Sequence, residues 1–228
     1  MKMRTIRKAA AVAAAIGLTV TGTMAAYGAT AAADTSVAYA TKSMGDGGTA
    51  DSVITGHIKV TNISVQVPMT SSFDIDPNKT VAAGGDGGAQ MGDQATNYTI
   101  TNLSTVPLDI SITKVTPVTG VELVQTVAAL DAKDKNVLFA IREASETVPK
   151  LPGGAGGDDA KWLSSGVLAT PYKVAATAGK NTIQASGAAG GADSLTMKVY
   201  AATKKGWKSG DSFTITPTFT VSLNTTTS

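Results

Sequence analysis

The segment FTITPTFTVSL, residues 213–223, decides the fold class of this 228-residue chain. Its odd-numbered positions carry apolar side chains, and its even-numbered positions carry only threonine or serine. Successive side chains of a β-strand point to opposite faces, so the alternation predicts a strand with one apolar face and one hydroxyl face. Pro217 has no N–H group for a neighbouring strand, so we expect this strand to lie at a sheet edge, to be bulged, or to change partners there.

The same alternation recurs along the chain and predicts about nine or ten strands. The other segments are 58–60, 63–67, 73–75, 98–100, 106–112, 137–141, 172–174 and 195–199. Many short strands separated by turn residues are typical of an all-β, antiparallel β-sandwich of jelly-roll-like design. The main helix candidate is 121–130 (VELVQTVAAL), whose apolar positions fit a helix or a buried strand equally well. We therefore expect at most one or two short helices.

Glycine-rich segments separate the predicted strands. They are 45–48, 84–93, 153–159 and 187–193, and each contains at least one aspartate. Glycine runs bury little apolar area, so we interpret these segments as long loops or flexible insertions. No change in composition divides the chain sharply, although 144–160 is the best candidate for a boundary. We predict a single sandwich domain over 51–228.

Residues 1–33 have the three parts of a secretory signal peptide. The first eight residues carry four basic side chains and no acid, an apolar stretch follows, and small residues end it at Ala31-Ala32-Ala33. A transmembrane anchor is the alternative, but the apolar run is short and rich in Ala, Gly and Thr. We predict cleavage after Ala33, with Ala31 as the alternative site, and a secreted protein without a membrane-spanning segment in the mature chain.

Removal of the signal peptide changes the charge of the protein. The whole chain has 19 basic and 17 acidic residues, and the first 33 residues hold four of the bases, which leaves 15 against 17, a net charge of −2. A mature chain close to neutral gives no electrostatic reason to expect nucleic-acid binding. The basic balance of the full sequence therefore belongs to the signal peptide.

The chain lacks the residue types and motifs on which most catalytic and metal sites depend. It has no cysteine and a single histidine, His57, which excludes thiolate and paired-histidine metal sites and cysteine nucleophiles. His57 opens a predicted strand and is expected to be a strand-end residue. No Gly-x-Ser-x-Gly segment marks a hydrolase nucleophile, and no glycine-rich segment ends in the Gly-Lys-Ser/Thr of a phosphate-binding loop. We expect a protein that is not an enzyme.

The segment FDIDPN, residues 73–78, holds the candidate metal ligands Asp74, Asp76 and Asn78. These residues match the first three ligand positions of an EF-hand calcium loop. The match then ends, because Lys79 stands where glycine is needed and Gly85 where the bidentate glutamate belongs. The alternatives are that the three residues form a turn, or that the two aspartates act as a catalytic pair. Calcium is the one cofactor that the sequence suggests.

The two tryptophans, Trp162 and Trp207, are the candidates for stacking on a ligand. Exposed aromatic rings stack on sugar rings in carbohydrate-binding modules. Packing in the core or beneath a loop is the alternative for both residues, and it is the commoner role for tryptophan.

The central segment YTITNLSTVPLDISITKV, residues 98–115, places two strands around an Asn-Ser turn. Together with a signal peptide and a threonine-rich sandwich without cysteine, it resembles exported surface proteins of Gram-positive bacteria. The nearest group is the camelysin/TasA-type matrix-fibre proteins. The resemblance implies a bacterial jelly-roll subunit of an extracellular fibre.

These observations predict a secreted, non-enzymatic structural protein that self-associates at the cell surface or in a matrix. The mechanism we expect is strand addition, in which an extended segment of one subunit completes a sheet of the next. The candidate donor lies in the flexible N-terminal segment 34–50, where Val37 and Tyr39 alternate with small residues. A disordered tail is the alternative for this segment. The alternative function is a monomeric cell-surface adhesin or carbohydrate-binding module, and a secreted glycan-active enzyme is a third class that needs two facing carboxylates.

Overall fold

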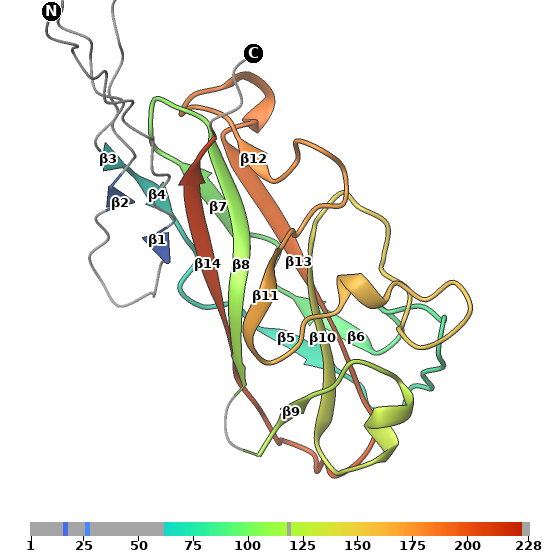
Figure 1. Cartoon of the computed structure of the whole chain (residues 1–228). Helices are drawn as coiled ribbons and strands as arrows, with labels where there is room; N and C mark the ends of the chain where they lie inside the picture. Colours follow the sequence, from blue (N-terminus) through green and yellow to red (C-terminus); the bar gives the residue numbers. More distant parts are fainter. Residues whose placement is uncertain (1–15, 18–25, 28–61, 118–119, 225–228) are drawn as a thin grey trace, which may run out of the picture.

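The computed structural model describes residues 16–17, 26–27, 62–117 and 120–224, and in this part of the chain the fold is all-β (Figure 1). Helix is limited there to three short 3₁₀ turns, η1 (Ala128–Asp131), η2 (Asp159–Lys161) and η3 (Ala189–Gly191). The predicted β-sandwich with very little helix is confirmed. The predicted signal peptide and donor segment lie outside the described residues, apart from two short strands, β1 (Ile16–Gly17) and β2 (Ala26–Tyr27).

The first sheet is built on the two longest predicted strands. Its order is β1–β14 (Ile215–Leu223)–β8 (Leu108–Pro117)–β11 (Gly166–Tyr172), and β12 (Thr182–Ile183) pairs with the end of β8, all antiparallel. A register shift follows Pro217, between Thr218 and Phe219. Thr218 pairs with Lys114 and Phe219 pairs with Ile112, so the extra residue at this bulge is Thr113 of β8. The ladder is irregular near Pro217, but the strand that bulges is β8 and not the strand that contains the proline.

The second sheet lies behind the first (Figure 1). Its order is β4 (Val65–Gln66), β7 (Thr99–Asn102), β13 (Ser194–Thr203), β10 (Asn136–Glu143) and β9 (Glu122–Leu123). Only the β9–β10 pair is parallel among the described strands. Two small antiparallel pairs complete the described structure, β2 with β3 (Asn62–Ile63) and β5 (Phe73–Ile75) with β6 (Met91–Gln94).

The main core fills the space between the two sheets. The apolar face of β14 contributes Phe219 and Val221, which pack with Ile110 and Ile112 of β8. The second sheet contributes the inward side chains Phe139, Ile141, Leu195, Met197 and Val199. The alternation of the sequence therefore places the apolar side of each strand in one shared interior, and the threonines of β14 on the opposite side.

A second core covers the outer face of β10 and β13. Leu138 and Ala140 of β10 and Tyr200 and Ala202 of β13 pack there against side chains from loops, namely Val81, Val124, Val127, Leu130, Leu151 and Trp162. Both faces of β10 are therefore buried, and seven of its eight residues are inaccessible to solvent. This third layer is not evident from strand alternation, because the side chains that form it lie in loops.

Two differences from the predicted elements have a simple cause. Residues 121–130 form neither a continuous helix nor a strand, because Glu122–Leu123 pairs with β10 and the chain then turns into η1. Residues 166–172 form β11, earlier in the chain than the predicted strand at 172–174. In both segments the bounds of the strand depend on its pairing with a neighbouring strand. The local sequence pattern contains no information about that neighbour.

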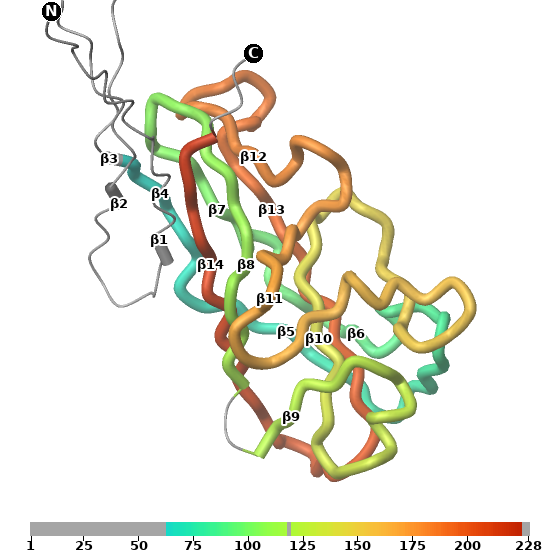
Figure 2. The backbone as a smooth tube through the Cα atoms, viewed as in Figure 1, coloured from blue at the N-terminus to red at the C-terminus, as the bar shows by residue number. Residues whose placement is uncertain are grey.

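The glycine-rich segments 84–93 and 153–159 are not free insertions. They lie side by side (Figure 2), and the backbone of Gly84 donates to the Leu151 carbonyl over 2.8 Å, while Leu151 donates back to Gly85 over 2.8 Å. Gly87 lies so close to the other loop that an added Cβ would stand 2.2 Å from the Pro149 carbonyl oxygen. Glycine here permits close backbone approach. The two segments are mostly loops, which is one of the two predicted options, and they are packed against each other rather than inserted freely.

Candidate functional site

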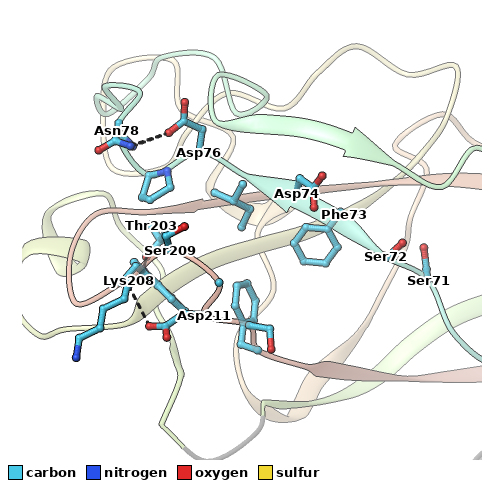
Figure 3. A pocket seen from close by; sticks show the side chains of 16 residues that line it. Ser71, Ser72, Phe73, Asp74, Asp76, Asn78, Thr203, Lys208, Ser209 and Asp211 are labelled. Carbon is cyan, nitrogen blue, oxygen red and sulfur yellow. Dashed lines mark hydrogen bonds between the residues drawn. The ribbon is translucent and has the colours of Figure 1, made fainter.

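A cavity of about 850 Å³ opens between β5 with its following turn and the segment 203–213 that leads into β14 (Figure 3). It brings together two features that the sequence marks separately: the candidate metal ligands Asp74, Asp76 and Asn78, and the candidate stacking residue Trp207. Cavities of about 300–1,000 Å³ hold small-molecule ligands in proteins. We therefore take this cavity as the candidate site.

The acidic side of the cavity is a strand end followed by a tight turn. β5 ends at Ile75, and the Lys79 amide donates to the Asp76 carbonyl over 3.2 Å to close the turn. Asp76 Oδ1 also accepts the backbone N–H of Asn78 over 3.0 Å and its side-chain amide over 3.2 Å (Figure 3). Asp76 and Asn78 are therefore turn formers, which was one of the alternatives, and Asp76 lies beyond the strand that holds Asp74.

Within the described residues, the fold brings no additional His, Cys, Asp or Glu side chain to the candidate calcium ligands to form a metal-binding group. Among the described residues, no group of three or more His, Cys, Asp or Glu side chains is placed to hold a metal ion. Asp76 uses one carboxylate oxygen within its own turn, and Asn78 turns its amide nitrogen toward that oxygen. Calcium binding by Asp74, Asp76 and Asn78 stays a prediction that direct titration has to test.

The apolar side of the cavity is a group of three half-buried aromatic rings. The Phe213 ring lies 5.3 Å from Trp207 at an interplanar angle of 45°, and 5.9 Å from Phe73 at 74°. Phe73 in turn lies 6.3 Å from Phe139 in the main core. The rings meet at an angle, so they form a concave corner that is supported from below by the sandwich.

Hydrogen bonding fixes the orientation of the Trp207 indole. Its Nε1–H donates to Thr203 Oγ1 over 2.6 Å, and the Thr203 hydroxyl donates to the Asn136 carbonyl over 2.7 Å. Thr203 is the last residue of β13 and is 2% exposed, so Trp207 is tied directly to the end of a core strand. The wall that Trp207 provides is therefore preorganised.

Lys135 contacts two residues of the site, the Trp207 ring and the Asp211 carboxylate. Its ammonium lies 5.2 Å from the centre of the Trp207 ring and 3.0 Å from Asp211 Oδ2. The Asp211 carboxylate also accepts the Lys208 backbone N–H over 3.1 Å, closing the turn shown in Figure 3. The hydrogen bonds from Lys135 and Lys208 lower the pKa of Asp211 below its ordinary value, so this group is ionised at neutral pH.

Trp162 does not belong to this cavity. It is 3% exposed in the second core, and its Nε1–H donates to the Lys150 carbonyl over 2.9 Å. Both ring faces are covered by protein, so Trp162 offers no surface for stacking on a ligand. The interpretation of Trp162 as a stacking residue is corrected to the alternative, a packing role beneath the glycine-rich loops.

Several site residues were not identified from the sequence. Phe73 and Phe213 were assigned only to strand faces, and Lys208 and Asp211 were not singled out at all, although the KSGD turn directly follows Trp207. The KSGD turn next to Trp207 was the sequence feature that could have pointed to Lys208 and Asp211. Val37 and Tyr39, the predicted assembly residues, lie outside the described residues.

In the ranges that the structure describes, no helix has the length and apolar character needed to cross a membrane. Comparison of the chain with protein-family models, with curated proteins and with solved structures finds no match.

Proposed function

We propose that this protein is a secreted, non-enzymatic structural subunit that assembles into an extracellular filament or matrix by strand addition. The observation that carries the proposal is the edge of the first sheet. β14 pairs with β8 along all nine of its residues. On its other side, within the described residues, β14 pairs only at Thr220 and Val221, with the two-residue strand β1.

A long strand with a largely unpaired side presents a row of N–H and C=O groups to any extended segment. β1 uses two of these positions in antiparallel pairing, so the edge accepts an additional strand. β1 consists of residues 16–17, which fall within the predicted signal peptide. Removal of residues 1–33 therefore takes β1 away and leaves this edge for another partner.

The other sheet edges favour strand addition much less. β11 pairs with β8 only at Gly166, Val167 and Tyr172, and its intervening residues, which include Pro171, depart from the ladder. Bulges and prolines are common devices that protect an edge from association. The outer strands of the second sheet, β4 and β9, have only two residues each. β14 also contains Pro217 and a register shift, but from Phe219 to Leu223 its pairing with β8 is regular. This regular part of β14 is thus the best acceptor edge in the described fold.

The proposed donor is the N-terminal segment of a second copy, with Val37 and Tyr39 as its anchoring side chains. In an extended segment these two residues share one face, while Ser36 and Ala38 point the other way. The pattern suits a strand with an apolar side directed toward the neighbouring subunit. This arrangement agrees with the resemblance to camelysin/TasA-type matrix-fibre proteins.

The experiment compares chains 34–228 and 45–228 by negative-stain electron microscopy and light scattering. We expect filaments from the longer chain and monomers from the shorter one. The double variant Val37→Asp/Tyr39→Asp should abolish filaments, whereas the control Ser36→Asp/Ala38→Asp, with the same added charge on the other face, should retain them. A monomer from chain 34–228 under all conditions contradicts the proposal and favours the alternative, a monomeric adhesin or carbohydrate-binding module.

Export is tested separately. Mass spectrometry of protein recovered from the culture medium of an expressing bacterium should give a chain that begins at Asp34, or at Ala32 for the alternative cleavage site. Retention of the complete N-terminus in the cell fraction contradicts secretion.

A further inference from the structure

We infer that the cavity beside Trp207 binds a neutral saccharide. The inference concerns a ligand site at one end of the sandwich and does not rest on self-assembly. Three features of the cavity carry it: the shape of the aromatic wall, the kind of polar groups at the rim, and the balance of charge.

The aromatic wall matches the apolar parts of a sugar ring. A pyranose presents C–H groups on its faces and hydroxyl groups around its edge, so it needs apolar contact on one side and hydrogen bonds around it. Phe73, Trp207 and Phe213 form the concave corner of the cavity and are half-buried. Aromatic side chains that combine large contact area with little conformational freedom are efficient at such contacts.

The rim provides hydrogen-bonding groups of the kind that hydroxyl ligands need. Serine hydroxyls from both sides of the cavity line it, at positions 71, 72, 209 and 212, and all four residues are exposed. Asp74 is also exposed and, within the described part of the chain, its carboxylate has no hydrogen-bond or ion-pair partner. Hydroxyls both donate and accept, and a free carboxylate accepts two or more hydroxyl protons. The rim therefore suits a ligand with many O–H groups.

The charge of the cavity selects against anionic ligands. Its lining has three carboxylates, of Asp74, Asp76 and Asp211, and one ammonium, of Lys208. Lys135 adds a second positive charge by pairing with Asp211, so three negative charges face two positive ones, a net charge of −1. A phosphate or a uronic acid would meet this excess of negative charge.

A cationic ligand is disfavoured for a different reason. The place where a cation would gain most is over the Trp207 ring and beside Asp211, and the protein's own Lys135 ammonium already holds it at 5.2 Å from the ring centre. A basic peptide would have to displace this contact. A neutral saccharide brings no negative charge to the carboxylates of the lining, and its hydroxyl groups can donate to Asp74 while the contact between Lys135 and Trp207 stays in place.

The cavity and the proposed assembly edge are separate along β14. Phe213 lines the cavity just before β14 begins, whereas β1 pairs with β14 at Thr220 and Val221. Thr220 and Val221 lie seven and eight positions after Phe213, a separation of roughly 23–26 Å in an extended chain. Ligand binding is measured on chain 45–228, which lacks the proposed donor segment, and the same titration can be read whether or not this chain associates.

The two tryptophans provide the test. Trp207 lines the cavity and Trp162 is buried outside it, so the Trp162→Phe variant leaves one tryptophan that reports on the site. We would titrate this variant with hexasaccharides of glucose, mannose, N-acetylglucosamine and xylose, with hexagalacturonate as the anionic probe and hexalysine as the cationic probe. We expect saturable change in Trp207 emission with at least one neutral oligosaccharide and none with the two charged probes.

The Asp74→Ala variant should weaken that binding on the order of tenfold, since a hydrogen bond to a charged group is lost. The matched control is Asp93→Ala, which removes an exposed aspartate from the neighbouring strand β6, outside the cavity lining. Should Trp162→Phe fail to fold, ¹⁹F NMR of the chain labelled with 5-fluorotryptophan separates the two indoles without a substitution. Equal affinity of the two aspartate variants, binding of only a charged probe, or no response to any neutral oligosaccharide overturns the inference.

Discussion

Arg142 and Glu146 form a buried ion pair across the turn that follows β10. Their side chains are only 4% and 10% exposed. The Glu146 carboxylate also accepts the backbone N–H groups of Ala176 and Thr177, over 2.5 and 3.1 Å, and Arg142 Nη1 donates to the Lys173 carbonyl over 2.9 Å. The pair therefore holds the segment after β11 against the end of β10, and joins the two sheets at that end.

Removal of the negative partner should destabilise the protein strongly. Glu146→Gln leaves the Arg142 guanidinium buried without its counter-charge, and breaking a buried pair in this way costs about 3 kcal/mol or more. We expect a loss of that size in the free energy of unfolding, measured by urea denaturation. The control is Glu122→Gln, whose side chain and that of its partner Lys133 are 57% and 70% exposed, and which should cost at most about 1 kcal/mol. Equal losses contradict a special role for the buried pair.

The same pair predicts how stability depends on pH. Burial by itself raises the pKa of Glu146, but the hydrogen bonds from the Thr177 and Ala176 amides and from Arg142 outweigh it, so the pKa lies below its ordinary value of 4.5. A carboxyl with a lowered pKa stabilises the fold above its unfolded-state pKa, and this contribution is lost as the pH falls further. Stability should therefore decline below about pH 4.5, and less steeply in Glu146→Gln than in the wild type. Parallel pH profiles of the melting temperature contradict this assignment.

Gly87 should tolerate no side chain. An alanine Cβ at this position would stand 2.2 Å from the Pro149 carbonyl oxygen and 2.8 Å from the Trp162 ring. We expect Gly87→Ala to lower the free energy of unfolding by about 1–3 kcal/mol, as overpacking does, and to shift the emission of Trp162. The neighbouring substitution Gly88→Ala is the control, since its Cβ would meet only side-chain atoms, at 3.3 Å and beyond. A melting temperature equally affected by both substitutions contradicts the packed arrangement of the two loops.

Asn102 holds the turn between β7 and β8 from inside the protein. It is fully buried, its amide donates to the Val106 and Gln184 carbonyls over 2.8 and 2.7 Å, and its Oδ1 accepts the Ser104 N–H over 2.8 Å. Asn102→Ala leaves these backbone groups without partners, and we expect a loss of about 2–4 kcal/mol. The exposed Asn78, which also bonds within a turn, is the control, and Asn78→Ala should cost less than about 1 kcal/mol. Thermal or urea unfolding distinguishes the two, and a small effect at Asn102 contradicts the inference that it anchors the turn.

The alternation of the sequence identifies most of the strands because it is a local property. Residues 213–223 predict β14 within two residues of its start, and five of the seven residues 106–112 lie within β8, which continues to Pro117. A strand with one buried face has to alternate whatever strand lies beside it. β6 was missed because Met91–Gln94 overlaps a glycine-rich segment, and only its pairing with β5 makes it a strand.

Local sequence patterns could not predict the second core, which side chains from loops form on the outer face of β10 and β13. Trp162 comes from a loop and covers the outer face of β10, in contact with the glycine-rich segment through Gly87. The sequence around Trp162 contains no periodicity that tells a buried ring from an exposed one. The packing of the two loops on the sheet buries Trp162 in the second core, whereas Trp207 lines the cavity.

The sequence by itself determined the class of the fold, since the spacing of apolar and hydroxyl side chains on each strand depends only on neighbours along the chain. It also marked Asp74, Asp76, Asn78 and Trp207 as residues of interest, through their types and local spacing. That these four residues line one cavity was decided by the tertiary structure, because β5 and the segment 203–213 are far apart in the chain. Contacts at such separations arise from strand pairing and core packing, whose energies depend on partners that no local segment contains.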